Sequence, residues 1–182
     1  LLTEAEAFRK LPEIFTDFGS LKLFNKYISP LLIISVLTCF ILYYVFKFTD
    51  IGRKLIAAGA NPDAAELSGI SVDRMFIYCH MLSGFLAALA GIMLTARIGA
   101  AIPSMAGHLG FDWLLPAFLA PVLGGTLLSG GKVTVFGTML GAILVTLINN
   151  GLYLIDVGEF WIRFFLGMIL LGAVLLDRAR EY

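Results

Sequence analysis

Long apolar runs separated by short polar stretches dominate the pattern of this chain. A helix needs about 20 predominantly apolar residues to cross the core of a bilayer. The third run along the chain is shorter and contains Pro116 and Pro121. Together the runs predict an all-α membrane protein, a bundle of about five transmembrane helices in one transmembrane domain over residues 27–182. The expected spans are Tyr27–Phe48, Met75–Ala96, Trp113–Leu128, Val133–Ile155 and Phe160–Leu176.

Residues 1–26 show a different, mixed pattern. Phe8, Leu11, Phe15 and Phe18 recur at helical spacing, but polar and charged residues interrupt them. Such a pattern is typical of a segment that lies on a membrane surface. We expect residues 1–26 to be an extracytoplasmic or interfacial segment.

The stretch 49–74, between the first two runs, is polar and carries the signals of two short helices. Asn61 can cap free backbone N–H groups, and Pro62 fits the first position of a helix. Gly69 supplies the left-handed residue that ends the second helix, and Gly59 is expected to end the first in the same way. The predicted helices cover residues 51–58 and 62–68.

Two helices of about two turns each are marginal in water by themselves, because helix nucleation is costly. Asp63 and Glu66 add negative charge near the positive end of the second helix. The stretch is therefore expected to dock against another molecule. We call the stretch 49–74 the elbow. A preformed corner of this kind on one face of a membrane suggests a transporter subunit that is driven by a soluble partner.

The composition supports a membrane protein. Hydrophobic residues make up 59% of the chain and charged residues 14%, with a mean hydropathy of +0.92, whereas soluble domains carry about 25% charged residues. Lys plus Arg and Asp plus Glu both number 13, so no nucleic-acid partner is expected. Cys39 and Cys79 lie in apolar runs without CxxC or metal-ligand spacing, so we expect two inert thiols and no metal site.

The distribution of Lys and Arg gives an orientation, because cytoplasmic loops carry an excess of both. Arg97 and Arg163 lie near span ends on the side with fewer basic residues. The bias places the stretch 49–74 and the C-terminus in the cytoplasm. The richer side holds Lys47, Arg53, Lys54, Arg74, Lys132, Arg178 and Arg180, and the poorer side holds Arg9, Lys10, Lys22 and Lys26.

Small residues mark two expected helix-packing surfaces. Gly137 and Gly141 form a GxxxG pattern, and Gly84, Ala88 and Gly91 place small residues on one stripe of the second span. Helices in lipid associate through close backbone approach at such residues. The pattern predicts a bundle and says nothing about cargo.

Three polar residues lie within the apolar runs. Asn149 and Asn150 are deep in the fourth span, and His80 is near the cytoplasmic end of the second. Polar groups at such depth are costly unless they are paired, and they often line a pathway. For the Asn pair, an interhelical hydrogen bond and a pathway or hinge role both remain open, whereas for His80 a packing role is favoured.

A glycine-rich run with Gly124, Gly125, Gly130 and Gly131 precedes Lys132. Phosphate-binding loops combine glycines with a lysine, but they continue with Ser or Thr, and here Val133 follows. We therefore expect a helix break near the cytoplasmic face, where irregular backbone is tolerated if it is buried in protein or faces a cavity. The four glycines are candidates for a pathway or a hinge.

Four blocks follow one another along the chain: GRKLIAAGANPDAAELSGISVDR, LSGFLAALAGIMLTARIGAAIPSMAG, VLGGTLLSGGKVTVFGTMLGAILVTLINNGL and FWIRFFLGMILLGAVLLDR. In this order and spacing, from about Ile51 to Arg178, they resemble the permease subunits of ribose- and xylose-type ABC sugar importers. The resemblance implies the C-terminal half of a multi-pass permease in the bacterial inner (plasma) membrane. Its implied partners are a second permease copy or paralogue, a cytoplasmic ATPase pair, and an extracytoplasmic sugar-binding protein that delivers a pentose or similar sugar.

The resemblance also implies that the polar elbow is the loop that couples the permease to its ATPase. Small Ala64 and Ala65 would let an ATPase groove approach closely, and Arg53 would pair with an acidic ATPase residue. The alternative is a solvated amphipathic loop that is held by its caps. ATP would be bound by the partner, so the chain is expected to have no catalytic residue and no cofactor of its own. The residues that match the family's coupling loop are Gly52, Arg53, Gly59, Asn61, Pro62, Ala65, Ser68, Gly69 and Ile70.

Two other classes of function fit the sequence less well. An intramembrane hydrolase would need a nucleophile, a base and an orienting group, but Ser83 and His80 share one helix without a third partner. A secondary transporter or a non-transporting assembly subunit is the main alternative. Ion coupling favours acidic or basic groups in mid-span, and none of the five runs has Asp or Glu at its centre. The sequence does not identify the sugar, nor whether the permease pairs with an identical copy.

Overall fold

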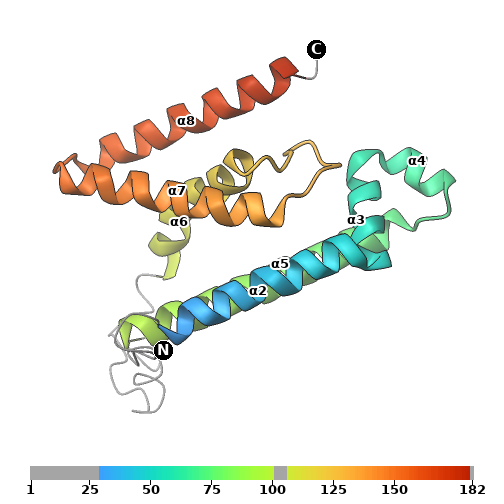
Figure 1. The fold of residues 1–182 in the computed structure, drawn as a ribbon, viewed down its shortest axis with the longest axis horizontal. Helices are drawn as coiled ribbons and strands as arrows, with labels where there is room; N and C mark the ends of the chain where they lie inside the picture. The colour runs from blue at the N-terminus through green and yellow to red at the C-terminus, as the bar shows by residue number, and fades with distance from the viewer. Residues whose placement is uncertain (1–28, 101–105, 181–182) are drawn as a thin grey trace. The chain divides into compact units, whose positions relative to one another are not determined.

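The computed structural model describes residues 29–100 and 106–180, which form seven α-helices and no strand (Figure 1). The all-α prediction is thus confirmed for this part of the chain. The predicted interfacial segment, residues 1–26, lies outside the described residues. The helices are α2 (Pro30–Phe48), α3 (Asp50–Ala60), α4 (Pro62–Leu67), α5 (Val72–Ile98), α6 (Ala106–Leu123), α7 (Val135–Leu154) and α8 (Glu159–Arg180).

Three of the helices are long and apolar enough to cross a membrane, namely α2, α5 and α7. They coincide within about three residues with the first, second and fourth predicted spans. The described apolar part of α6, Asp112–Leu123, is shorter than a span requires. The first turns of α8 carry Glu159 and Arg163. Five spans therefore stay a prediction, and three are supported by length and composition in the described residues.

The helix predicted for the third span is wrong at its C-terminal end. The span is predicted over Trp113–Leu128, but α6, which includes Trp113, ends at Leu123. The apolar run continues through Leu127 and Leu128, whereas the helix ends because Gly125 adopts a left-handed conformation with φ +78°. Backbone geometry, and not hydropathy, sets this boundary.

The prediction that Gly59 ends the first short helix is also wrong. Helix α3 continues through Ala60, and Gly59 is not among the glycines with positive φ. The helix ends because Asn61 is extended, with φ −154° and ψ 101°. A residue that precedes a proline disfavours the helical conformation, so Pro62 explains the stop.

The chain divides into two compact units. In the described residues, the first unit joins the start of α2, up to Ile41, with α5. Large apolar side chains on both helices are exposed, among them Leu37 and Phe85, which are 58% and 65% exposed. Exposed apolar surface of this extent is typical of a face that meets lipid or other helices.

The second unit holds the end of α2, the short helices α3 and α4, helix α6 from Gly110 on, and helices α7 and α8. Its core is apolar and is built by side chains from three helices, α6, α7 and α8. Leu119 of α6 is fully buried at the centre of this core. The other buried members are Ala120, Val145, Ile162 and Leu166.

Within this unit, α6 and α7 approach so closely that only glycine fits between them. A Cβ on Gly137 would overlap the carbonyl of Gly124, and a Cβ on Gly141 would overlap the carbonyl of Ala120. The GxxxG pattern of α7 therefore lies against α6, which is how small residues permit helix association in lipid.

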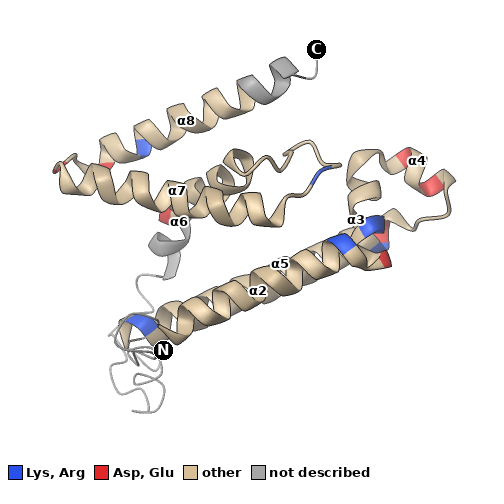
Figure 2. Ribbon diagram, in the orientation of Figure 1, with Lys and Arg blue, Asp and Glu red and all other residues tan. Residues whose placement is uncertain are grey.

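Charged residues are few along the long helices and gather at the α3–α4 region and near helix ends (Figure 2). One charged group ties α8 to α6: the Nη2 of Arg163 donates to Asp112 Oδ1 at 2.7 Å and to Glu159 Oε1 at 2.8 Å. All three side chains are partly exposed. Pairing reduces the cost of holding an arginine beside an apolar helix.

Candidate functional site: the α3–α4 elbow and the loop that meets it

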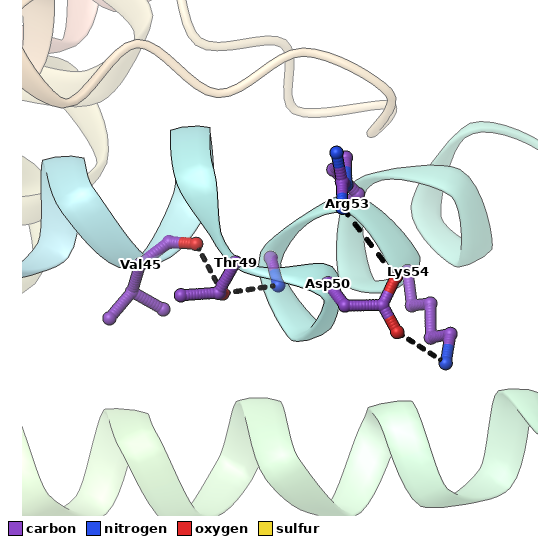
Figure 3. A network of polar contacts seen from close by, with 6 residues as sticks. Val45, Thr49, Asp50, Arg53 and Lys54 are labelled. Carbon is purple, nitrogen blue, oxygen red and sulfur yellow. Dashed lines mark hydrogen bonds and ion pairs between the residues drawn. The ribbon is translucent and has the colours of Figure 1, made fainter.

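The polar elbow begins with a tight corner between α2 and α3, shown in Figure 3. The hydroxyl of Thr49 donates to the carbonyl of Val45 at 2.6 Å and accepts the backbone N–H of Gly52 at 3.2 Å. It thereby caps the N-terminus of α3. A Cβ on Gly52 would overlap the Val45 carbonyl, so this position requires glycine. Gly52, predicted as a coupling residue, is thus a residue of the corner.

The first turn of α3 carries three charged side chains that face solvent. Asp50 accepts from Lys54 Nζ at 2.6 Å, and the Nη2 of Arg53 lies 3.9 Å from the same carboxylate (Figure 3). The hydrogen bond from Lys54 and its positive charge lower the pKa of Asp50, with a smaller contribution from Arg53. The Arg53 side chain is 68% exposed, and its Nη2 is 3.9 Å from Asp50. Its guanidinium is therefore accessible to an acidic side chain of another protein.

The start of α4 is capped as the sequence predicts. The Oδ1 of Asn61 accepts the backbone N–H of Ala64 at 3.1 Å, and Pro62 occupies the first turn. The carbonyl of Asn61 accepts the N–H of Ala65 at 3.0 Å. Asn61 therefore ends α3 and starts α4, which fixes the angle between the two helices.

The end of α4 is closed by a Schellman motif. The N–H of Ile70 donates to the carbonyl of Ala65 at 3.0 Å, and the N–H of Gly69 donates to that of Glu66 at 2.9 Å. Gly69 has φ +80°, which a residue with a side chain rarely adopts. The Ser68 hydroxyl donates to the carbonyl of Ala64 at 2.8 Å, so Ser68 also serves this helix end.

The two faces of α4 differ sharply. Ala65 is only 4% exposed, so its side chain does not lie on the surface that a partner would meet. Leu67 is 91% exposed, although it is apolar and outside every predicted span. Sequence reasoning missed Leu67. Residues two apart on a helix lie about 200° apart around its axis, so Leu67 is nearly opposite Ala65, but the sequence does not show that Ala65 is on the buried side.

The connection between α6 and α7, called here the 124–134 loop, is held to both helices. The N–H of Thr126 donates to the carbonyl of Pro121 at 2.9 Å, closing a second Schellman motif at the end of α6. The Thr134 hydroxyl donates to the carbonyl of Gly124 at 2.6 Å, and the Thr134 N–H donates to Thr126 Oγ1 at 3.1 Å. Threonine hydroxyls thus join the two ends of the loop, with Thr138 Oγ1 3.2 Å from that of Thr126.

The tip of this loop lies against the end of α3. Gly130 and Gly131, with φ +95° and +82°, pack on Gly59 and Ala60. The elbow and the glycine-rich run, which are separate elements in the sequence, therefore meet at Gly59 and Gly130. Gly125 has a similar φ of +78°, but a Cβ there would meet no atom within 4 Å.

The other predicted residues do not join this contact. Asn149 Oδ1 is buried with no hydrogen-bond partner in the described residues, and Asn150 is exposed, so their roles stay predictions. Gly84, Ala88 and Gly91 are exposed on α5, and their packing role also stays a prediction.

His80 is partnered within its own helix, because its Nδ1 donates to the carbonyl of Phe76 at 2.8 Å. Among the residues that the structure describes, no three His, Cys, Asp or Glu side chains come together in a way that could hold a metal ion.

Apolar helices joined by a capped polar elbow define this chain as part of a multi-pass α-helical membrane protein. Residues 4–174 match the family described as "Branched-chain amino acid transport system / permease component". The chain belongs to this family of transport permeases.

Curated relatives carry more specific names. Ribose import permease protein RbsC of Haemophilus influenzae is 38% identical over 148 residues, covering 81% of this chain and 44% of that protein. RbsC of Bacillus subtilis is 41% identical over 146 residues, covering 80% and 44%. Xylose transport system permease protein XylH of H. influenzae is 38% identical over 166 residues, covering 90% and 43%.

The resemblance to ribose- and xylose-type ABC permeases is thus confirmed. The chain spans less than half the length of these relatives. No solved structure matches the chain.

Proposed function

We propose that this chain is part of the permease of an ATP-driven, binding-protein-dependent importer for a pentose or similar sugar, and that the α3–α4 elbow couples it to a cytoplasmic ATPase. The observation that carries the proposal is the elbow itself, a polar corner between apolar helices that is capped at Thr49 and Asn61 and in which Leu67 is 91% exposed. The names of the relatives support the choice of cargo.

The proposed orientation places the elbow and the C-terminus in the cytoplasm of a bacterial cell, with the chain in the inner membrane. Lys47, Arg53 and Lys54 gather where α2 ends and α3 begins, as the excess of basic residues in cytoplasmic loops favours. The domain over residues 27–182 would cross the membrane five times, with α6 and α8 as the two spans beyond α2, α5 and α7.

The proposed docking surface combines an apolar and a basic anchor. Leu67 would enter an apolar groove of the ATPase, and Arg53 would pair with an acidic residue beside that groove. Ala64 is exposed and small, so it would allow close approach. Ala65 is buried and would support the elbow from within.

In the proposed cycle, ATP binding closes an ATPase pair, and the closure displaces α3 and α4. The displacement switches the helix bundle from outward to inward access. An extracytoplasmic binding protein would supply the sugar, and a second permease copy or paralogue would complete the pathway. The chain would perform no covalent chemistry, because ATP is hydrolysed by the partner.

Asn149, Asn150 and the glycines of the 124–134 loop are the candidates for pathway or hinge roles. Asn149 Oδ1 has no hydrogen-bond partner in the described residues, and a buried carbonyl of this kind favours a partner beyond them. A sugar hydroxyl or a neighbouring helix would satisfy it.

The test is cysteine crosslinking from α4. The chain, in the longest form in which it is expressed, is produced with the ABC ATPase encoded beside it, after Cys39 and Cys79 have been replaced by Ser. Leu67→Cys should crosslink to the ATPase with a yield that changes with ATP. Ala65→Cys, two residues away but buried, is the matched control and should crosslink weakly. If Leu67→Cys gives no crosslink in correctly inserted protein, the docking proposal is wrong.

A further inference from the structure

The end of α3 and the 124–134 loop touch backbone against backbone. A Cβ on Gly130 would overlap the carbonyl of Gly59, and a Cβ on Gly131 would lie 3.1 Å from the Cβ of Ala60. Both loop glycines also have left-handed φ values. Position 130 therefore requires glycine for its conformation and, independently, for its contact with α3.

The loop is in turn fixed to the α6–α7 pair. Thr134 Oγ1 donates to the Gly124 carbonyl at 2.6 Å, and Thr126 Oγ1 accepts the Thr134 N–H. Just beyond, Gly137 lies so close to Gly124 that a Cβ would overlap backbone atoms. The contacts at Gly130, Gly131, Gly124 and Thr134 involve backbone atoms, the Ala60 methyl group and short threonine side chains.

We propose that Gly130 and Gly131 form a mechanical relay, through which a displacement of α3 moves the 124–134 loop and the α6–α7 pair as one body. The inference rests on the proposed docking of the elbow. Long side chains can absorb a displacement by changing rotamer, but close-packed backbone cannot, and packed elements shift as rigid bodies. The relay would carry the movement from the ATPase to the helices that build the core.

The first test compares alanine at three glycines that share a left-handed conformation. The readout is the ATP-dependent change in the spectrum of a spin label at Leu140 of α7, which is 67% exposed, measured with the ATPase present. This readout does not depend on the identity of the sugar. Gly125→Ala is the matched control, because its φ is similar but a Cβ there meets nothing.

Gly130→Ala should reduce the ATP-dependent change at Leu140 severalfold, since the added Cβ would overlap the Gly59 carbonyl and separate the loop from α3. Gly125→Ala should reduce it less, because it shares the cost of the left-handed conformation but adds no overlap with α3. Gly131→Ala should have an intermediate effect, because its nearest atom is the Ala60 side chain, and adding Ala60→Gly should restore the change. Equal effects at Gly125 and Gly130 would overturn the relay.

The second test locks the contact covalently. Ala60→Cys and Gly131→Cys, in protein without Cys39 and Cys79, should form a disulfide in every nucleotide state, because the contact is proposed to persist. The oxidised protein should show the same ATP-dependent change at Leu140 as the same variant in its reduced form. Loss of the change that a reductant reverses, or failure of the disulfide to form, would contradict movement as one body.

The outcomes separate this inference from the docking proposal. A crosslink from Leu67→Cys together with no ATP-dependent change at Leu140 in the parent protein would overturn the relay and leave docking intact. Absence of the Leu67 crosslink would instead remove the docking on which the relay rests.

Discussion

The close contact between α6 and α7 predicts opposite effects of the same substitution at two glycines of α7. A Cβ on Gly141 would overlap the carbonyl oxygen of Ala120 and lie 3.2 Å from the N of Gly124. A Cβ on Gly151 would meet no atom within 4 Å. Gly151→Ala is therefore the matched control for Gly141→Ala, because both change a glycine of α7 to alanine.

The magnitude follows from two contributions to the free energy of unfolding. Alanine in place of a helical glycine stabilises by roughly 0.5–1 kcal/mol, and this gain is common to both variants. At Gly141 the two helices must also move apart, and overpacking of this kind costs about 1–3 kcal/mol. Because the common gain cancels, Gly141→Ala should be less stable than Gly151→Ala by about 1–3 kcal/mol.

The assay is reversible unfolding in mixed micelles, with helix content followed by far-ultraviolet circular dichroism as the fraction of denaturing detergent rises. Gly151→Ala should unfold at the same detergent fraction as the parent or a higher one, and Gly141→Ala at a lower one. Equal midpoints for the two variants would refute the inference that α6 and α7 meet at a distance only glycine allows.

Two further predictions concern the elbow. The hydrogen bond from Lys54 lowers the pKa of Asp50 below its ordinary value of 3.8, so the stabilisation is present above that value and is lost as pH falls through the lowered pKa. The protection of the α3 amides from hydrogen exchange, relative to the intrinsic exchange rate at each pH, should fall over that range. Asp50→Asn should abolish this pH dependence of the protection, and the same dependence in Asp50→Asn would count against the pairing. Gly69→Ala should destabilise the end of α4 by about 1–2 kcal/mol, because φ is +80° there, whereas Gly69→Asn should retain most of the protection of the Ile70 N–H from exchange. Equal protection in the two Gly69 variants would show that the left-handed conformation is not required.

Local chemistry made the second short helix predictable from sequence. Asn61, Pro62 and Gly69 each act on the backbone within a few residues, and their roles follow from the caps they form. The long apolar helices were predictable for a similar reason, because a membrane span requires a continuous apolar run. These features need no knowledge of what lies across the fold.

The features that sequence reasoning missed depend on tertiary contacts or on competition between two local rules. A glycine near a helix end is compatible with a left-handed cap or with an ordinary helical position, and Gly59 holds the second, with its carbonyl against Gly130. At the end of α6, the apolar run through Leu128 favoured a longer helix, but Gly125 stops it. The exposure of Leu67 follows from the side of α4 that is buried, which a helix of six residues is too short to reveal by periodicity.

The small size of the elbow bears on what it can contribute to coupling. Helix α4 has six residues, so its surface is far below the roughly 800 Å² per partner of a standard interface. Full burial of one leucine contributes about 1.5–3 kcal/mol, which anchors a contact but does not hold an assembly together. Yet the backbone of the elbow is held at several points. It has caps at Thr49 and Asn61, a Schellman motif at Gly69, and the contact with residues 130 and 131. On the proposed function, its contribution is therefore stiffness, because a rigid corner transmits a displacement that a flexible loop of equal affinity would absorb.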